Sequence, residues 1–374
     1  MTASAALPRR RIGLAQIGLL VAVLAAVALI VLPGNADRAK SPAQTGPLGP
    51  AEAWPGVTIG QFPGNVSDGP AFSPSYFLDA QTAIGTAPSP DGAFMRLVRR
   101  AGDGTLRELR RLPYSGAPQF GGFATDGTEL AWAESLAGDD NVTRTEMWAM
   151  RLPDGEPRRL TADTGDVVFF NSEYDMLIAE RSLYWAEVAP GDEPATLIRS
   201  VPLAGGDVTT GTEDGAWAMT KFPWLVSAES GQASLPKLRD WRNNRELTVA
   251  AGGTELVTCG SVWCRVLVIS ADGPARTDLM RPDGSDRRRM AGGAAMSAVT
   301  DVALLDRFEV LTEAGPDTIP TSSQILYVYD IEKQQTVRVA DAVGMIQSRN
   351  GVLWWSTGAD TDIVWHTLPL TAIG

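Results

Sequence analysis

Histidine and cysteine are almost missing from this chain. Its 374 residues include one histidine, His366, and two cysteines, Cys259 and Cys264. A zinc site needs three or four His, Cys or carboxylate ligands, and an HExxH motif alone needs two histidines. A GxSxG nucleophile motif is also absent. The sequence therefore names no catalytic, cofactor-binding or metal-binding residue, and it leaves any ligand-binding residue unknown.

Basic residues are few beside acidic ones. The formal charge is −12, and three of the 32 Lys and Arg residues, Arg9, Arg10 and Arg11, precede the first acid, Asp37. Removing these three leaves 29 basic residues against 44 acidic ones. Because nucleic-acid binding depends on Lys and Arg that neutralise phosphates, this balance argues against a nucleic-acid partner.

Long apolar runs are absent except for one, residues 12–32, "IGLAQIGLLVAVLAAVALIVL". Roughly 20 apolar residues in a helix span a bilayer, so we predict a transmembrane signal-anchor helix here. The three arginines before it favour a cytoplasmic amino terminus, residues 1–11, and an extracytoplasmic remainder. The alternative is a cleaved signal peptide and a secreted protein, since Gly34 and Ala36 supply small residues for cleavage after Ala36.

Proline, glycine, alanine and serine dominate residues 33–55. This composition predicts an extended linker rather than a folded element. We therefore expect the folded domain to occupy residues 56–374, with no separate α/β domain in front of it.

Short apolar strands, often aromatic, recur through that domain. They start at Ala93, Glu129, Ser182, Pro223, Val262, Arg307 and Val352. The mean spacing of about 43 residues is typical of β-propeller blades. A second motif follows in phase, a hairpin whose turn contains Asp154-Gly155, Gly205-Gly206, Asn243-Asn244, Asp283-Gly284 or Glu332-Lys333. Gly, Asn and Asp tolerate the positive φ of tight hairpin turns.

Two hairpins in each repeat predict four strands, so the fold class is all-β. We expect a single β-propeller, with seven blades favoured over six or eight, and a β-sandwich as the alternative fold. The last repeat ends after its third strand. "AWPGVTIG", residues 53–60, is the candidate for the missing fourth strand, which would close the ring.

The repeats resemble those of the TolB-like propeller family. The resemblance rests on "SPDG" at 89–92, "TDGTELAWAE" at 125–134 and "MWAMRLPDGEPRRLT" at 147–161, and it extends over roughly residues 85–345. The whole layout is similar to that of membrane-anchored, exported TolB-like proteins of actinobacteria. The resemblance implies a propeller that serves as a binding platform. The anchor and the missing amino-terminal domain put TolB's own role in doubt.

The two cysteines enclose "GSVW" at the mouth of a hairpin, where facing Cα atoms lie near disulfide distance. We predict a Cys259–Cys264 disulfide in an oxidising compartment, over a redox pair that lacks CxxC spacing. His366 is expected on a strand with a local partner, since a catalytic base needs a nucleophile beside it.

Three further features have a structural and a functional interpretation. The acidic stretches at 138–141 and 358–362 are expected to be solvated hairpin tips rather than calcium loops. Arg287, Arg288 and Arg289 are expected on an outer strand rather than in an anionic-ligand site. The eleven tryptophans are expected in the core rather than in a carbohydrate site.

The function expected from these observations is non-catalytic binding or scaffolding by a membrane-anchored, extracytoplasmic and monomeric propeller. Its partner is a protein or a cell-envelope component. The alternative is an envelope-sugar lyase or hydrolase with carboxylates at the central channel. Fold alone does not decide between them.

Overall fold

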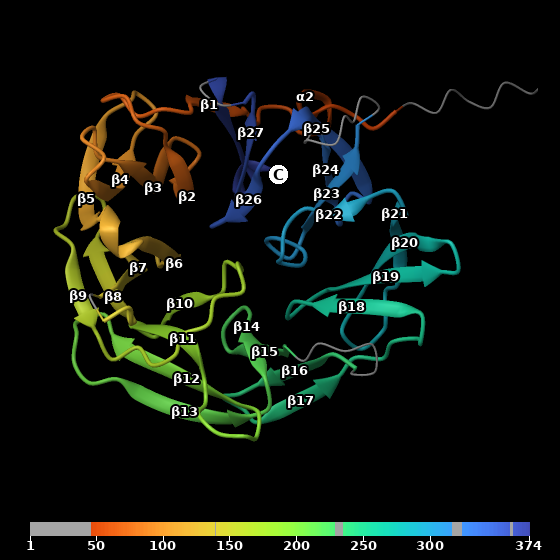
Figure 1. Ribbon diagram of the computed structural model, residues 1–374. Helices are drawn as coiled ribbons and strands as arrows, with labels where there is room; N and C mark the ends of the chain where they lie inside the picture. The colour runs from red at the N-terminus through yellow and green to blue at the C-terminus, as the bar shows by residue number, and fades with distance from the viewer. Residues whose placement is uncertain (1–45, 139, 229–234, 316–323, 360–361) are drawn as a thin grey trace, which may run out of the picture. The chain divides into compact units, whose positions relative to one another are not determined.

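Four-stranded antiparallel sheets account for the described part of the chain, residues 46–138, 140–228, 235–315, 324–359 and 362–374 of the computed structural model. Seven such sheets lie as blades around a common centre, with the first strand of each blade innermost (Figure 1). The all-β propeller and its seven blades are thereby confirmed. The predicted membrane segment, residues 12–32, lies outside the described residues. Within those residues no helix has the length and apolarity needed to cross a bilayer.

The first four blades follow one another along the chain. Blade 1 contains β2 (Ser73–Asp79), β3 (Thr82–Pro88), β4 (Phe94–Arg100) and β5 (Leu106–Pro113), followed by the short helix η1 (Tyr114–Gly116). Blade 2 contains β6 (Gln119–Thr125), β7 (Glu129–Ala137), β8 (Thr143–Arg151) and β9 (Arg158–Thr161). Blade 3 contains β10 (Met176–Ala179), β11 (Ser182–Val188), β12 (Ala195–Pro202) and β13 (Thr209–Asp214). Blade 4 contains β14 (Trp217–Met219), β15 (Trp224–Ser227), β16 (Lys237–Asp240) and β17 (Arg245–Thr248).

The last three blades continue this order until the ring closes. Blade 5 contains β18 (Glu255–Cys259), β19 (Cys264–Ser270), β20 (Gly273–Met280) and β21 (Arg288–Gly292). Blade 6 contains β22 (Met296–Ser297), β23 (Phe308–Ala314), β24 (Gln324–Asp330) and β25 (Gln335–Val343). Blade 7 contains β26 (Ile346–Arg349), β27 (Val352–Thr357) and β28 (Val364–Pro369), then the short helix η3 (Leu370–Ala372), and it takes its outer strand from the start of the domain.

The burial of each strand follows its place in the blade. Several second strands contain continuous buried apolar runs, such as Leu183–Ala186 in β11, because neighbouring blades cover both of their faces. Outer strands such as β13 are polar and exposed. Each hydrophobic cluster fills the wedge between adjacent blades; one of them joins Tyr76 of blade 1 to Phe123 and Trp132 of blade 2. Eight of the eleven tryptophans are buried and the other three are half-buried, which confirms their place in the core.

The structure confirms the predicted hairpins fully and the predicted apolar strands with one exception. All five predicted hairpins join the third and fourth strands of a blade, as Asp154-Gly155 does between β8 and β9. Six of the seven apolar strands are second strands. The first of the seven was assigned the wrong phase, since the strand beginning at Ala93 is β4, the third strand of blade 1. The true second strand, β3, reads "TAIGTAP" and has no aromatic residue by which the repeat could be recognised.

Ring closure uses an amino-terminal strand, but not residues 53–60 as predicted. The closing strand is β1 (Gly60–Pro63), which pairs antiparallel with β28 so that Phe62 faces Trp365. Residues before it form the short helix α2 (Pro50–Ala53) and a turn in which Val57 donates to the Trp54 carbonyl. Trp54 is buried beside Phe308 and holds this segment by packing, so the strand begins only at Gly60.

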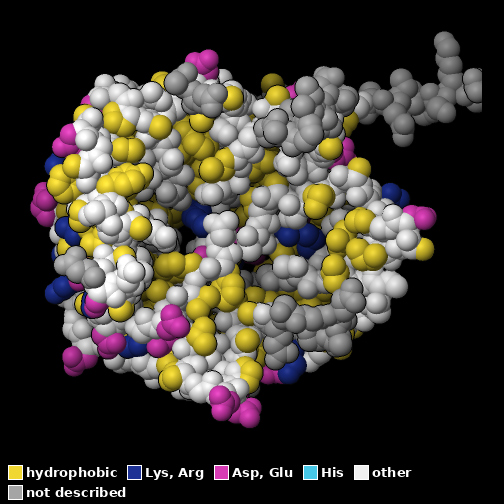
Figure 2. Space-filling model, in the orientation of Figure 1, with side chains coloured by type: hydrophobic (Ala, Val, Ile, Leu, Met, Phe, Trp, Pro, Cys, Tyr) yellow, Lys and Arg dark blue, Asp and Glu magenta, His cyan; other side chains and the backbone are white. Residues whose placement is uncertain are grey.

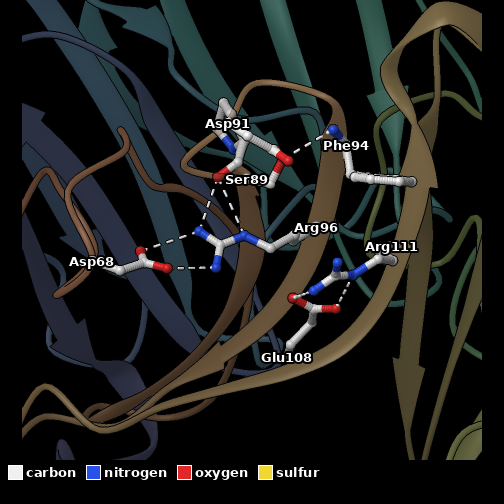
Figure 3. Close-up of polar contacts among 8 residues, drawn as sticks. Asp68, Ser89, Asp91, Phe94, Arg96, Glu108 and Arg111 are labelled. Atoms are coloured by element: carbon white, nitrogen blue, oxygen red, sulfur yellow. Dashed lines mark hydrogen bonds and ion pairs between the residues drawn. The ribbon is translucent and has the colours of Figure 1, made fainter.

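An ion pair between a buried arginine and an exposed aspartate connects the segment after the closing strand to blade 1. Arg96 on β4 donates to both carboxylate oxygens of Asp68, at 2.6 and 3.1 Å, and also to the Pro88 carbonyl (Figure 3). Asp68 lies in the connection that leads from β1 into blade 1. In the neighbouring turn the Ser89 hydroxyl bonds to Asp91 and accepts the amide of Phe94 at 3.0 Å. The Ser-Pro-Asp-Gly sequence therefore has a structural role at the edge of the ring closure.

Candidate functional site

The predicted disulfide is present and lies at the hairpin that connects the first two strands of blade 5. Cys259 ends β18 and Cys264 begins β19, and the two residues face each other with their Cα atoms 4.0 Å apart. The disulfide covalently links β18 and β19, the inner two strands of this blade. Cys259 and the turn that follows it also border a cavity of about 220 Å³.

His366 has the local partner that its sequence context predicts. It lies on β28, and its Nε2 is 2.8 Å from the hydroxyl of Thr357 on the adjacent strand. Its ring stacks on Trp355 at a centroid distance of 5.4 Å. Burial lowers the pKa of this imidazole. His366 therefore packs within blade 7, away from the carboxylates at the centre of the ring described below.

Of the arginine run, Arg288 and Arg289 lie on the outer strand of blade 5, β21, as predicted, and Arg287 directly precedes that strand. Arg287 and Arg289 are exposed and Arg288 is half-buried, which is the expected alternation. Arg287 pairs with Glu255 at 2.7 Å and with Asp278 at 2.9 Å. Arg288 lies over the ring of Trp263, 4.9 Å from its centroid. These contacts make the run part of the blade's own packing.

The two acidic stretches are described only in part, since Asp139, Asp360 and Thr361 lie outside the described residues. In the first stretch Asp140 pairs with Arg144 at 2.6 Å, and this hydrogen-bonded pairing lowers the pKa of Asp140 to about 2. Across the described residues no three His, Cys, Asp or Glu side chains are grouped as metal ligands.

The centre of the ring contains a loop that the sequence patterns did not predict. Residues 166–175 connect blade 2 to β10, and they extend toward the centre together with the β22–β23 connection, residues 298–307 (Figure 1). The Ser172 hydroxyl donates to Asp301 at 2.5 Å, and the Glu173 amide donates to the other oxygen of Asp301 at 2.8 Å. One carboxylate thus joins two loops that belong to blades 3 and 6.

Residues of blade 7 also form hydrogen bonds with the central loop, residues 166–175. Arg349 donates to the side-chain oxygen of Asn171 at 2.9 Å, and the Asn350 amide donates to Glu173 at 3.1 Å. The Asn350 side chain also donates to the carbonyl of Phe77 on the inner strand of blade 1, at 3.0 Å. The loop is therefore fastened to blades 6 and 7 directly and to blade 1 through Asn350.

A buried ion pair fixes the second central loop. Glu309 on β23 is fully buried and pairs with Arg265 of blade 5 at 2.9 Å. Its other oxygen accepts the amide of Ala303 at 2.6 Å, and Arg265 also donates to the carbonyl of Asp301 at 2.9 Å. These bonds set the position from which Asp301 reaches the central loop.

Three central carboxyl groups have raised pKa values. Burial raises the pKa of Asp175 to about 6, although its two oxygens accept the amides of Phe170 and Ser172. Burial, and then the nearby charge of Asp301, raise the pKa of Glu173. Burial also raises the pKa of Asp301. Desolvated carboxyls of this kind are found in active sites and in structural networks alike.

The cavity beside the disulfide adjoins this cluster. Residues of the central loop, of blades 4 and 5 and of the β22–β23 connection line it, among them Ser172, Tyr174, Thr258 and Asp301. Burial and the neighbouring Glu173 raise the pKa of Tyr174, so its hydroxyl stays protonated. The lining of the cavity therefore includes both hydroxyl groups and carboxylates.

One sequence signal marks this central loop. Leu130 and Leu183, equivalent positions in blades 2 and 3, are 53 residues apart, about 10 more than the mean repeat. The excess shows that an insertion is present. It does not show that the insertion turns inward, because that depends on Asp301, Arg349 and Asn350 from distant blades.

Comparison with known proteins supports the fold. No family model matches the chain, and no curated protein matches it. An oligogalacturonate lyase in complex with manganese is similar over 84% of this chain and 96% of its own, at 13% identity and a TM-score of 0.51. A putative TolB from Agrobacterium tumefaciens matches 63% of this chain and 84% of its own at 15% identity, with a TM-score of 0.40.

A puromycin-hydrolyzing peptidase from Mycobacterium tuberculosis matches 84% of this chain and 53% of its own, at 13% identity and a TM-score of 0.47. The similar structures thus include TolB and propeller-containing enzymes. At these identities the likeness to the lyase extends to the propeller fold alone, and the weaker likenesses add nothing to it.

Proposed function

We propose that this chain is a TolB-like, membrane-anchored propeller that acts outside the cytoplasm as a non-catalytic binding or scaffold module. Its partner in this proposal is a protein or another cell-envelope component. The apolar segment 12–32 serves as the anchor. The residues from 33 up to the compact unit, which begins at Pro47, serve as the linker. The Cys259–Cys264 disulfide supports an oxidising location, since such bonds are rare in the cytoplasm.

The binding role is supported mainly by the hydrogen bonds that the central carboxylates already make within the protein. Asp175 accepts two amides of its own loop, and Asp301 accepts a hydroxyl and an amide of the same loop. Because these carboxylate oxygens already accept hydrogen bonds from protein groups, the cluster fixes the central loop, residues 166–175, in its position. A rigid ring with fixed loops is suited to recognising a partner through its surface.

Crosslinking of intact producing cells, followed by affinity purification of the full-length chain, tests the binding role. We expect one protein to be recovered reproducibly, and its absence under every growth condition tested would contradict the proposal. Amino-terminal sequencing of the exported chain distinguishes the anchor from the alternative, secretion after cleavage behind Ala36. An intact amino terminus supports the anchor, and a chain that begins at Asp37 supports secretion.

A second candidate function is an envelope-sugar lyase or hydrolase. The raised pKa values of Asp175, Glu173 and Asp301 favour it, because general acid-base catalysis often uses a carboxyl whose pKa burial has raised. The test is release of reducing ends or unsaturated products from envelope polysaccharides by the full-length chain. Activity that Glu173→Gln abolishes and the surface change Asp103→Asn leaves intact supports an enzyme, and no release by the wild-type chain contradicts it.

A further inference from the structure

The antiparallel order of the strands gives the propeller two distinct faces. Connections from first to second and from third to fourth strands lie at one face. Connections from second to third strands and from one blade to the next lie at the opposite face, which we call the interblade face. The two faces are built from separate segments of the chain, so their compositions can be compared directly.

Exposed hydrophobic side chains gather on the interblade face. Of the ten large hydrophobic residues that are exposed in the described chain, only Leu305 lies in a connection of the other face. The remaining nine lie in interblade-face connections or on the strand ends beside them: Tyr114, Val142, Phe169, Phe170, Val188, Leu235, Leu256, Met296 and Met345. Figure 2 shows hydrophobic side chains around the hollow at the centre of the ring. Most of these residues are spread around the ring, but Phe170 and Val188 line one cavity of this face together.

Basic side chains are also distributed unequally between the two faces. The described interblade-face connections contain no Lys or Arg. They contain the acids Asp68, Asp91, Asp140, Asp163, Asp166, Glu173, Asp175, Asp192, Glu193, Asp272 and Asp362. The described connections of the opposite face contain seven basic residues, Arg181, Lys221, Arg242, Arg281, Arg287, Arg307 and Lys333. They also contain eleven acids, Asp103, Asp126, Asp154, Glu156, Glu180, Asp207, Asp283, Asp286, Asp301, Asp306 and Glu332. Eleven acids stand on each side, so the formal charge of the described connections is −11 on the interblade face and −4 on the opposite face. The interblade face is therefore both apolar and acidic.

A cavity of about 200 Å³ combines these two properties on the interblade face, between blades 3 and 4. Val168, Phe170 and Trp217 provide apolar walls. Asp192 and Glu193, in the β11–β12 connection, stand at its edge, are exposed, and make no ion pair with any described residue. Glu187, deeper in the same cavity, is already neutralised by Arg199 at 2.7 Å.

We infer that this cavity receives a lysine or arginine side chain from a basic segment of a partner protein. Such a residue lies along the cavity, so that its aliphatic stem packs on the apolar walls and its charged end reaches Asp192 and Glu193 at the rim. Apolar residues of the same segment cover neighbouring side chains such as Val188. Charge complementarity steers the encounter and excludes acidic partners and anionic lipid surfaces. This inference rests on the proposed binding role and specifies its face and its partner chemistry.

Photo-crosslinking in producing cells tests the inference on the full-length chain. Val188 and Leu305 are exposed to similar extents, 54% and 45%, on opposite faces. Each is replaced in turn, as Val188→benzoylphenylalanine and Leu305→benzoylphenylalanine. We expect a protein crosslinked at position 188 alone, through a peptide with an excess of Lys and Arg. A position-188 crosslink to an acidic or uncharged peptide, or to a second copy of this chain, overturns the inference.

The other outcomes separate this inference from the proposed function. A crosslink at position 305 alone overturns the inference and leaves a binding role in place. No crosslink at either position overturns the inference, and it also contradicts the binding role if affinity purification recovers no partner.

A matched pair of charge reversals completes the test. Glu193 and Asp207 are exposed acids on opposite faces of blade 3, and neither has an ion-pair partner among the described residues. Glu193→Lys is expected to lower the yield of the position-188 crosslink about tenfold, because like charges repel across an interface. Asp207→Lys should leave the yield unchanged. Equal effects of the two reversals would overturn the inference.

Discussion

Ser172 and Asp301 are 129 residues apart in the chain, yet the Ser172 hydroxyl donates to the Asp301 carboxylate at 2.5 Å. The same carboxylate accepts the amide of Glu173. The first residue belongs to the loop that enters blade 3, and the second belongs to a connection within blade 6. This contact ties distant blades together at the centre of the ring, and it explains why the inserted loop turns inward.

Removal of the Asp301 carboxylate should destabilise the central loop, residues 166–175. Asp301→Ala leaves the Ser172 hydroxyl and the Glu173 amide without their acceptor, which costs about 1–3 kcal/mol of unfolding free energy. Urea unfolding measures the cost, and hydrogen exchange over residues 168–175 should accelerate. Asp306→Asn is the control, because the exposed Lys221–Asp306 pair that it weakens contributes about 0–1 kcal/mol. Equal effects of the two substitutions would contradict the role given to Asp301.

The raised pKa of Asp175 predicts a pH dependence of stability. Its carboxyl titrates at about 6 in the folded chain, against a reference value of 3.8. The folded state therefore binds the proton more tightly, and the contribution to stability is full below pH 4 and is lost as the pH rises through 6. At about 1.4 kcal/mol per pH unit the loss is about 3 kcal/mol.

The Asp175→Asn variant isolates this contribution. Unfolding free energies of the wild type and the variant are compared from pH 4 to pH 7, so that other titrating groups cancel. The wild type should lose stability relative to the variant as the pH rises. A constant difference, or a gain by the wild type, would contradict the assignment.

Ring closure by β1 predicts a large effect at Phe62. This side chain is buried against Phe77, with ring centroids 5.7 Å apart, while Gln61 beside it is exposed. Phe62→Ala should cost about 3–5 kcal/mol of unfolding free energy, and Gln61→Ala should cost little. The comparison is made by urea unfolding of the full-length chain. A small cost at Phe62 would show that β1 contributes little to closing the ring.

The disulfide is expected to have a modest local effect. Mass spectrometry of the exported chain without reductant should find Cys259 and Cys264 bonded. The double variant Cys259→Ser, Cys264→Ser should lose about 2 kcal/mol, because the bond closes only a short loop. Two free thiols in the exported chain, or unchanged stability of the variant, would contradict this expectation.

The sequence predicted the repeating parts of this fold and missed the parts that depend on distant contacts. The turns at Asp154-Gly155 and its counterparts were predictable because local backbone conformation selects Gly, Asn and Asp. The first repeat was misassigned because β3 has no aromatic residue. The closing strand was misplaced because Trp54 holds its segment by packing. The central site was missed because Asp175, Glu173 and Asp301 come together only in the closed ring.

Hydrogen exchange on the full-length chain, compared with and without its copurified partner, tests the binding role most directly. We predict slower exchange on partner binding in the interblade-face segment 188–194, and unchanged exchange in the opposite turn, residues 203–208. Unchanged exchange throughout the propeller would contradict the proposal that this ring is a binding module.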